Sequence, residues 1–185
     1  MKALHETLKH LRRGDTILYP TDTVWGIGCD ATNPEAVKKV YALKERDDSK
    51  ALICLVSGVE MLQQYVKNVP PQALEIIFGA VRPTTIIYND PINLALNLVA
   101  ADNTIAIRIP LDPFCRELVA AFGKPVVSTS ANKSGRSTPR IFQEIPKAIL
   151  KDVGYVVNLH QDRACGPPSS ILKIKKDGTI AVIRE

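Results

Sequence analysis

The sequence predicts an α/β protein in which a twisted, mixed parallel/antiparallel sheet is covered by helices. Segments typical of strands alternate with segments typical of helices along most of the chain. Antiparallel pairs are also required, because two strand-like segments, 84–88 and 104–109, have no clear helix between them. The chain closes with a hairpin pattern around Asp177-Gly178, a favoured turn dipeptide. The 185 residues are 45% hydrophobic and contain no linker-like segment, so we expect a single domain over residues 1–185.

The expected helices follow from apolar residues at helical spacing or from a favoured first residue. Leucines recur at helical spacing before Gly14, which predicts an amphipathic first helix. Asn33 before Pro34 is a suitable N-cap with proline at the first helical position, and it predicts the second helix. Proline also begins the next two helices. The expected helices cover residues 3–13, 34–44, 70–77, 113–122 and 146–152.

The expected strands are short apolar runs that end at turn residues. The run over residues 51–56 is apolar throughout, which indicates a strand buried on both faces. The last two runs flank the Asp177-Gly178 turn and should pair with each other. The expected strands cover residues 16–19, 51–56, 84–88, 104–109, 125–128, 155–158, 170–175 and 179–184.

The composition is mildly basic and gives no sign of disulfides. Lys and Arg number 24 against 19 Asp and Glu, a net charge of +5, which is compatible with nucleotides or RNA without proving either. Cys29, Cys54, Cys115 and Cys165 are scattered without a C-x-x-C pair, so we expect reduced cysteines that pack in the core.

Several function classes have no support in the sequence. No apolar run of about 18 residues could span a membrane, and the polar N-terminus does not resemble a signal peptide, so we expect a cytoplasmic protein. His5 and His10 lie roughly 140° apart around a helix and cannot share a metal, and we expect no metal site made by the protein. No Ser-His-Asp or Cys-His set that would indicate a covalent nucleophile is discernible.

Two polar segments follow strand-like runs and mark the candidate binding site. Residues 19–30 and 128–135 both turn from apolar sequence into hydroxyl, amide and glycine residues where a strand should end. Loops beyond strand ends are the usual ligand sites of α/β sheets. Neither segment is a G-x-x-x-x-G-K-[ST] loop or a G-x-G-x-x-G fingerprint, and neither motif occurs elsewhere in the chain.

With these segments, the chain resembles the YrdC family, the threonylcarbamoyl-AMP synthases that begin threonylcarbamoyladenosine synthesis on tRNA. That family shows PT-[DE]-T-V-[YW]-G-[LI]-G, then K-x-R, then A-[VI]-R-[IVM]-P, then S-A-N. All four occur here in that order, at residues 20–28, 44–46, 106–110 and 130–132. The resemblance covers nearly the whole chain and implies a YrdC-like fold.

The resemblance implies a threonine site. Arg108 follows Thr104 and Ala106 on one face of an extended strand, where its guanidinium would have room for a carboxylate. Local sequence alone also allows an arginine on a solvated face or in a core ion pair. In the family this arginine contacts threonine, and the remaining threonine contacts carried over by the resemblance are Thr21, Ser128 and Ser169.

The resemblance also implies an ATP site with a catalytic set. Ser128, Ser130 and Asn132 would share a face if the chain stays extended, although a turn that satisfies its own backbone is the local alternative. Lys44 and Arg46 could equally be solvated charges at a helix end. The catalytic set would be Lys44, Arg46, Ser130 and Asn132, and the ATP contacts would be these four with Lys50, Thr104, Arg136 and Arg184.

Some positions depart from the family pattern. Residues 80–82 read Ala-Val-Arg where many members have W-P-G, Asp47 stands where proline usually follows K-x-R, and Leu55 replaces a histidine of some members.

The implied reaction condenses L-threonine, bicarbonate and ATP into threonylcarbamoyl-AMP and pyrophosphate, with Mg²⁺ carried by ATP rather than held in a protein cage. A tRNA-modifying transferase complex would act downstream, and tRNA or double-stranded RNA could bind directly. The alternative is a double-stranded-RNA-binding or ribosome-maturation module of the same fold without synthase activity. The sequence does not give the oligomeric state.

Overall fold

The computed structural model describes residues 2–46, 52–175 and 177–185. Within them, strands form one sheet in the order β7-β1-β2-β6-β3-β5-β4-β8-β9. The pairs β1–β7, β3–β5 and β4–β8 are parallel and the others antiparallel, so the predicted mixed sheet is confirmed. The strands are β1 (Ile17–Tyr19), β2 (Gly26–Gly28), β3 (Ile53–Leu55), β4 (Thr84–Asn89), β5 (Thr104–Arg108), β6 (Val126–Ser130), β7 (Tyr155–Val156), β8 (Ser170–Ile174) and β9 (Ile180–Arg184).

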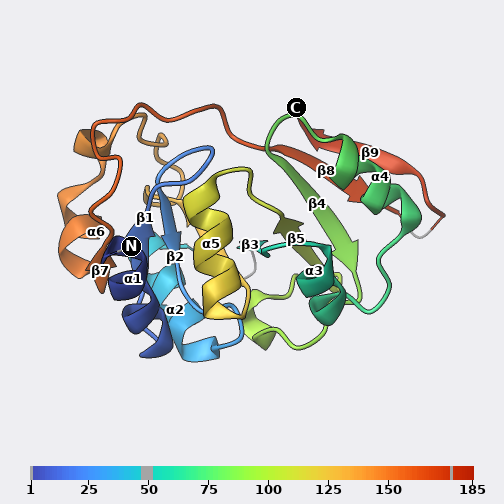
Figure 1. Ribbon diagram of the computed structural model, residues 1–185, viewed down its shortest axis with the longest axis horizontal. Helices are drawn as coiled ribbons and strands as arrows, with labels where there is room; N and C mark the ends of the chain where they lie inside the picture. Colours follow the sequence, from blue (N-terminus) through green and yellow to red (C-terminus); the bar gives the residue numbers. More distant parts are fainter. Residues whose placement is uncertain (1, 47–51, 176) are drawn as a thin grey trace.

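Helices lie on both sides of the sheet, with α5 in front in Figure 1 and α3 and α4 toward the β8–β9 hairpin. The Asn33 N-cap is confirmed, since its side-chain oxygen accepts the N–H groups of Glu35 and Ala36 at 3.0 and 3.2 Å. The α-helices are α1 (Lys2–Arg12), α2 (Pro34–Lys44), α3 (Val59–Tyr65), α4 (Pro71–Gly79), α5 (Pro113–Phe122) and α6 (Lys147–Asp152), with 3-10 turns η1 (Leu96–Leu98) and η2 (Phe142–Glu144). No described helix is long and apolar enough to cross a membrane.

Alternating side chains give the two sheet faces separate cores. In β1, Ile17 and Tyr19 pack in one cluster with residues of α1 and α5, whereas Leu18 packs in the other with residues of α2 and α6. In β6, Val126 packs in the first cluster, with Ile17 and Tyr19, and Val127 packs in the second, with Leu18. The faces are therefore fixed by strand alternation, and the α1/α5 face is the one that carries the site described below.

One α-helix and one β-strand were not expected from the sequence. α3 has seven residues and begins after Gly58 without a side-chain cap, so its local signal is weak. β2 is the tripeptide Gly26-Ile27-Gly28, which forms a strand because β1 and β6 pair with it on either side. A Cβ at Gly28 would lie 2.5 Å from the Val127 carbonyl oxygen, so this close approach requires glycine.

Candidate active site

A cavity of about 350 Å³ lies on the α1/α5 face of the sheet. The strand register explains its floor: Gly26 pairs with Ser130, Ser128 with Ile53, and Ile53 with Ala106, so these lining residues share one face. By the same register Arg108 and Ser130 lie at opposite ends of the floor, four residues apart along the strands, or roughly 13 Å. The cavity is therefore elongated enough for two ligand groups, one at the Arg108 end and one at the Ser130 end.

The described lining is cationic and rich in hydroxyl groups. It contains three arginines and no acidic residue, which favours anionic ligands. The arginines come from separate parts of the chain: Arg46 after α2, Arg108 at the end of β5 and Arg184 at the end of β9. The hydroxyl residues of the lining are Thr21, Thr23, Ser128, Thr129, Ser130, Thr138 and Ser169.

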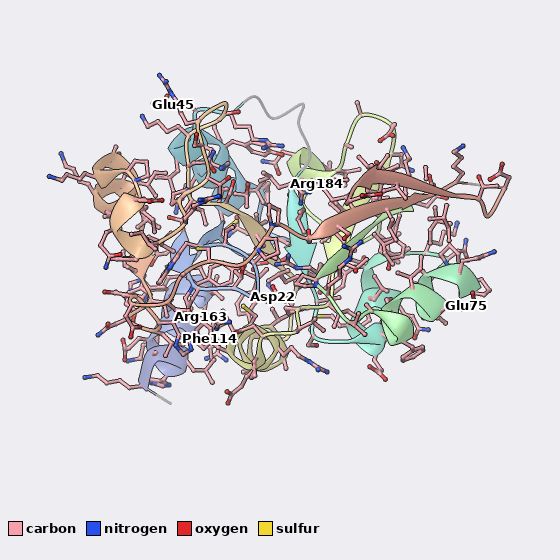
Figure 2. The ribbon with its side chains drawn as sticks, turned by 90° about the horizontal axis from the view of Figure 1, so that it is seen from above. Asp22, Glu45, Glu75, Phe114, Arg163 and Arg184 are labelled. Carbon is pink, nitrogen blue, oxygen red and sulfur yellow. The ribbon has the colours of Figure 1, made fainter. Side chains whose placement is uncertain are left out.

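Arg108 is buried and pairs with an acid. Its side chain is 3% exposed, and its Nη2 lies 3.1 Å from Oδ1 of Asp22, whose side chain is 7% exposed. Its Nη1 also donates to Thr23 Oγ1 at 3.4 Å. Arg108 thus lines the cavity, and the core ion pair that local sequence allowed is present as well. Figure 2 shows Asp22 near the centre of the molecule, while Glu45 and Glu75 lie at its periphery.

The other predicted threonine contacts all line the cavity. The Thr21 hydroxyl donates to the Val24 carbonyl at 2.7 Å, which closes a tight turn after β1. Ser169 is buried, and its hydroxyl lies 2.8 Å from that of Thr85. Ser128 lies on β6 at the centre of the floor. The structure therefore brings Thr21, Arg108, Ser128 and Ser169 together from four separate segments.

Arg184 reaches the cavity from the hairpin that ends the chain. Its Nε and Nη2 donate to the Ser169 carbonyl oxygen at 3.0 and 2.8 Å. Burial, and then the positive charge of Arg108, lowers the pKa of Arg184 below its ordinary value. An anion between the two guanidiniums would relieve their repulsion, which fits a phosphate or carboxylate ligand.

Lys44 is buried rather than solvated. Its side chain is among the largest fully buried ones, with 1% of the residue exposed. Its ammonium donates to the carbonyl oxygens of Ser130 and Asn132 at 2.5 and 2.7 Å. Burial, and then the charge of Arg46, lowers its pKa to about 8. Lys44 thus ties the end of α2 to the turn after β6, and two of its three donors are used there.

Asn132 does not follow the predicted geometry. β6 ends at Ser130, where the chain turns with the Asn132 N–H donating to the Ser130 carbonyl at 2.9 Å, so the expected extension to residue 132 is wrong. The side-chain amide donates to the carbonyl oxygens of Lys133 and Arg136 at 3.1 and 2.5 Å. Asn132 is not among the described lining residues, whereas Ser130 is. Its amide nitrogen therefore serves the turn, as the local alternative proposed.

Two further predicted ATP contacts are not brought to the cavity wall. The Thr104 hydroxyl donates to Asp102 Oδ1 at 2.6 Å, and Thr104 does not line the cavity. Arg136 is exposed in the turn after β6 and is also absent from the described lining. Lys50 lies outside the described residues, as does Asp47. Arg46 does line the cavity.

Sequence reasoning missed several lining hydroxyls and the acid that meets Arg108. Thr23 and Asp22 were within a segment already singled out, and strand alternation alone could not assign them a partner about 85 residues away. Thr138 belongs to none of the sequence motifs described above. Among the positions that depart from the family pattern, Leu55 is fully buried in the core, Ala80 and Arg82 line a separate groove beside α4, and Val81 is exposed.

The described residues contain no group of three or more His, Cys, Asp or Glu side chains placed to hold a metal ion. The cysteines are all free, as expected, and three of them are buried. His10 pairs with Asp15 at 2.8 Å and stacks on Tyr155, and these contacts do not involve His5.

The chain is similar to known proteins in sequence and in fold. The Sua5/YciO/YrdC family model, described as "Telomere recombination", matches residues 9–185. The chain is 36% identical over 152 residues to the threonylcarbamoyl-AMP synthase of Pseudoalteromonas translucida, covering 80% of this chain and 81% of that protein.

Two solved structures share the fold. Escherichia coli YciO superposes with a TM-score of 0.86 at 23% identity, covering all of this chain and 89% of that one. Pyrococcus abyssi Sua5 complexed with L-threonine gives a TM-score of 0.80 at 20% identity, covering 92% of this chain. The chain spans 50% of the length of that Sua5 structure.

Proposed function

We propose that this chain, which belongs to the Sua5/YciO/YrdC family, condenses L-threonine, bicarbonate and ATP into threonylcarbamoyl-AMP and pyrophosphate. The observation that carries the proposal is the cavity itself, with three arginines and no acid among its described lining residues. The names of the curated relatives support a synthase rather than an RNA-binding module without activity. In reaction class the enzyme would be a nucleotidyltransferase.

The shape of the floor suggests how the reactants would lie. The carboxylate of threonine would meet Arg108 at one end, with Thr21, Ser128 and Ser169 around the amino acid. The triphosphate would extend toward Ser130 and Arg46 at the other end. A carbamate formed on the threonine amine would then face the α-phosphorus from within the same cavity.

The protein would contribute mainly proximity and charge neutralisation. Bicarbonate yields CO₂ with loss of hydroxide, the threonine amine adds to the CO₂, and the proton that the amine loses leaves with that hydroxide as water. The carbamate oxygen then attacks the α-phosphorus while pyrophosphate leaves. Holding the reactants together can account for several kcal/mol of the barrier, about 7–11 at best. Arginines near the phosphates stabilise the departing pyrophosphate. Mg²⁺ would arrive with ATP as part of that substrate.

The remaining parts of the proposal concern the setting of the reaction. The product is a reactive mixed anhydride that a tRNA-modifying transferase complex would consume, which makes tRNA a partner of the pathway and a candidate direct ligand. ATP, threonine and bicarbonate are cytoplasmic metabolites, so the proposed location is the cytoplasm.

The test is pyrophosphate release by the purified chain with ATP and bicarbonate. Release should require L-threonine and should stop when bicarbonate is removed. Serine, which lacks the methyl group of threonine, and valine, which lacks its hydroxyl group, provide matched controls. Salt-sensitive RNA binding without threonine-dependent pyrophosphate release would instead favour the RNA-binding module.

A further inference from the structure

Arg108 is held in its position by a buried acid that does not itself line the cavity. Asp22 and Arg108 have side chains 7% and 3% exposed, and only Arg108 is among the described lining residues. The Asp22 carboxylate therefore lies beside the guanidinium on its protein side, away from the space a ligand would occupy.

Asp22 is itself anchored by the backbone. Its Oδ2 accepts the N–H of Leu111 at 2.9 Å, in the loop between β5 and α5. Because Asp22 precedes β2 and Leu111 follows β5, this bond fixes the carboxylate relative to both segments of the site. The acid is thus a rigid point against which the arginine can be aligned.

The pair leaves donors and acceptors unused. Within the described part of the chain, neither Asp22 Oδ1 nor Arg108 Nε has a hydrogen-bond partner, although both atoms are buried. The 3.1 Å contact between Oδ1 and Nη2 brings the charges together without an aligned hydrogen bond. A guanidinium has five N–H donors, and the described residues accept one hydrogen bond from it, at Thr23.

Such an arrangement has a physical reason in a binding site. A buried charge without a partner is strongly destabilising, so an arginine that waits for an anionic ligand needs a counter-charge while the site is empty. A fully satisfied pair, in contrast, would have to be broken before a ligand carboxylate could bind. The loosely aligned Asp22 contact supplies the counter-charge, and Arg108 still lines the cavity, where its remaining donors can meet a ligand carboxylate.

We propose that Asp22 is a positioning residue that orients the Arg108 guanidinium for the carboxylate of the amino-acid substrate. This inference rests on the proposed function, in which Arg108 binds threonine. Asp22 stays on Arg108 when the substrate binds, so the guanidinium then serves two carboxylates on different edges.

The first experiment is steady-state pyrophosphate release by Asp22→Asn, with threonine and ATP varied separately. An asparagine keeps an oxygen that can accept the Leu111 N–H, so the anchor remains while the charge is lost. The KM for threonine should rise roughly 10-fold or more, as expected when a charged hydrogen-bonding arrangement is disturbed. The KM for ATP should change less than twofold.

The matched control is Asp30→Asn. Asp30 is also buried, with a side chain 8% exposed that pairs with Lys124 at 3.0 Å, and it does not line the cavity. Its variant should melt at lower temperature without a change in the threonine KM. An unchanged or lowered threonine KM in Asp22→Asn overturns the proposal, since the acid would then be inert or a competitor of the substrate.

A second measurement needs no variant of Asp22. The guanidinium ¹H–¹⁵N resonances of Arg108 are identified in the ligand-free protein by their loss in Arg108→Lys. Hindered rotation, seen as separate Nη resonances, supports positioning, whereas averaged resonances contradict it. If the unmodified protein releases no pyrophosphate with threonine, the proposed function fails, but this spectrum still decides whether the Arg108 guanidinium is held in one orientation before a ligand binds.

Discussion

The two ends of the cavity use their polar groups in different ways. At the Ser130 end, the Lys44 ammonium and the Asn132 amide nitrogen bind backbone carbonyls, so these groups hold the fold together. At the Arg108 end, a buried guanidinium and the Asp22 carboxylate keep atoms without hydrogen-bond partners among the described residues; Asn132 Oδ1 at the Ser130 end also has none, but it belongs to a neutral amide. Substitutions at the first end should therefore appear mainly in stability, and those at the second end mainly in ligand binding.

The largest effect is expected for Arg108→Ala. Threonine-dependent pyrophosphate release should fall at least about 30-fold, because losing a charge-assisted contact in a closed pocket costs on the order of 2–5 kcal/mol. Calorimetric titration should show ATP binding largely intact. Normal activity at low threonine would show that the Arg108 end is not the amino-acid site.

The same change should also destabilise the protein, since Asp22 would be buried without its counter-charge. Adding Asp22→Asn should recover most of the lost free energy of unfolding and none of the activity. This double variant separates the stability part of the Arg108 effect from the binding part.

The next effect concerns the pH dependence of stability at the Ser130 end. Burial lowers the pKa of Lys44 to about 8 from its ordinary 10.5, so between these values the unfolded chain holds a proton that the folded chain has released. Stability therefore rises with pH across this window, by up to about 3 kcal/mol from this group.

Denaturant unfolding between pH 7 and 10.5 gives the free energy of unfolding of the unmodified protein and of Lys44→Met. Subtracting one from the other removes the contributions of the other groups that titrate in this range. The difference in free energy of unfolding should grow with pH in favour of the unmodified protein. A flat difference would mean that Lys44 titrates normally and is not desolvated in solution.

The smallest effect contrasts two neighbours in the turn after β6. Asn132→Ala removes an amide bonded to two carbonyls and should lower the free energy of unfolding by about 1–3 kcal/mol. Ser130→Ala should change it by less than about 0.5 kcal/mol and should instead lower turnover several-fold. Thermal melts and activity per folded molecule measure both; a stable but inactive Asn132→Ala would return Asn132 to the nucleotide site.

Much of the fold could be predicted because its signals are local. The Asn33-Pro34 start of α2 and the turn at Gly178, whose φ is +83°, were predictable from single residues. β2 could not be, since a Gly-Ile-Gly strand exists only through the strands that pair with it on both sides. α3 is short and uncapped, so its formation depends on packing residues such as Leu62 into the core.

The candidate site also has some features that local sequence predicts and others that depend on contacts between distant segments. Strand alternation alone indicated that Ala106 and Arg108 share a face and that Ser128 and Ser130 do so, because side chains in a strand repeat every two residues whatever the partner strands are. The sequence by itself thus determined which residues can face the site. Only the tertiary structure decided which of them do: it buried Lys44 against Ser130 and placed Asp22 on Arg108. These outcomes depend on contacts between segments about 85 residues apart, and no local pattern encodes them.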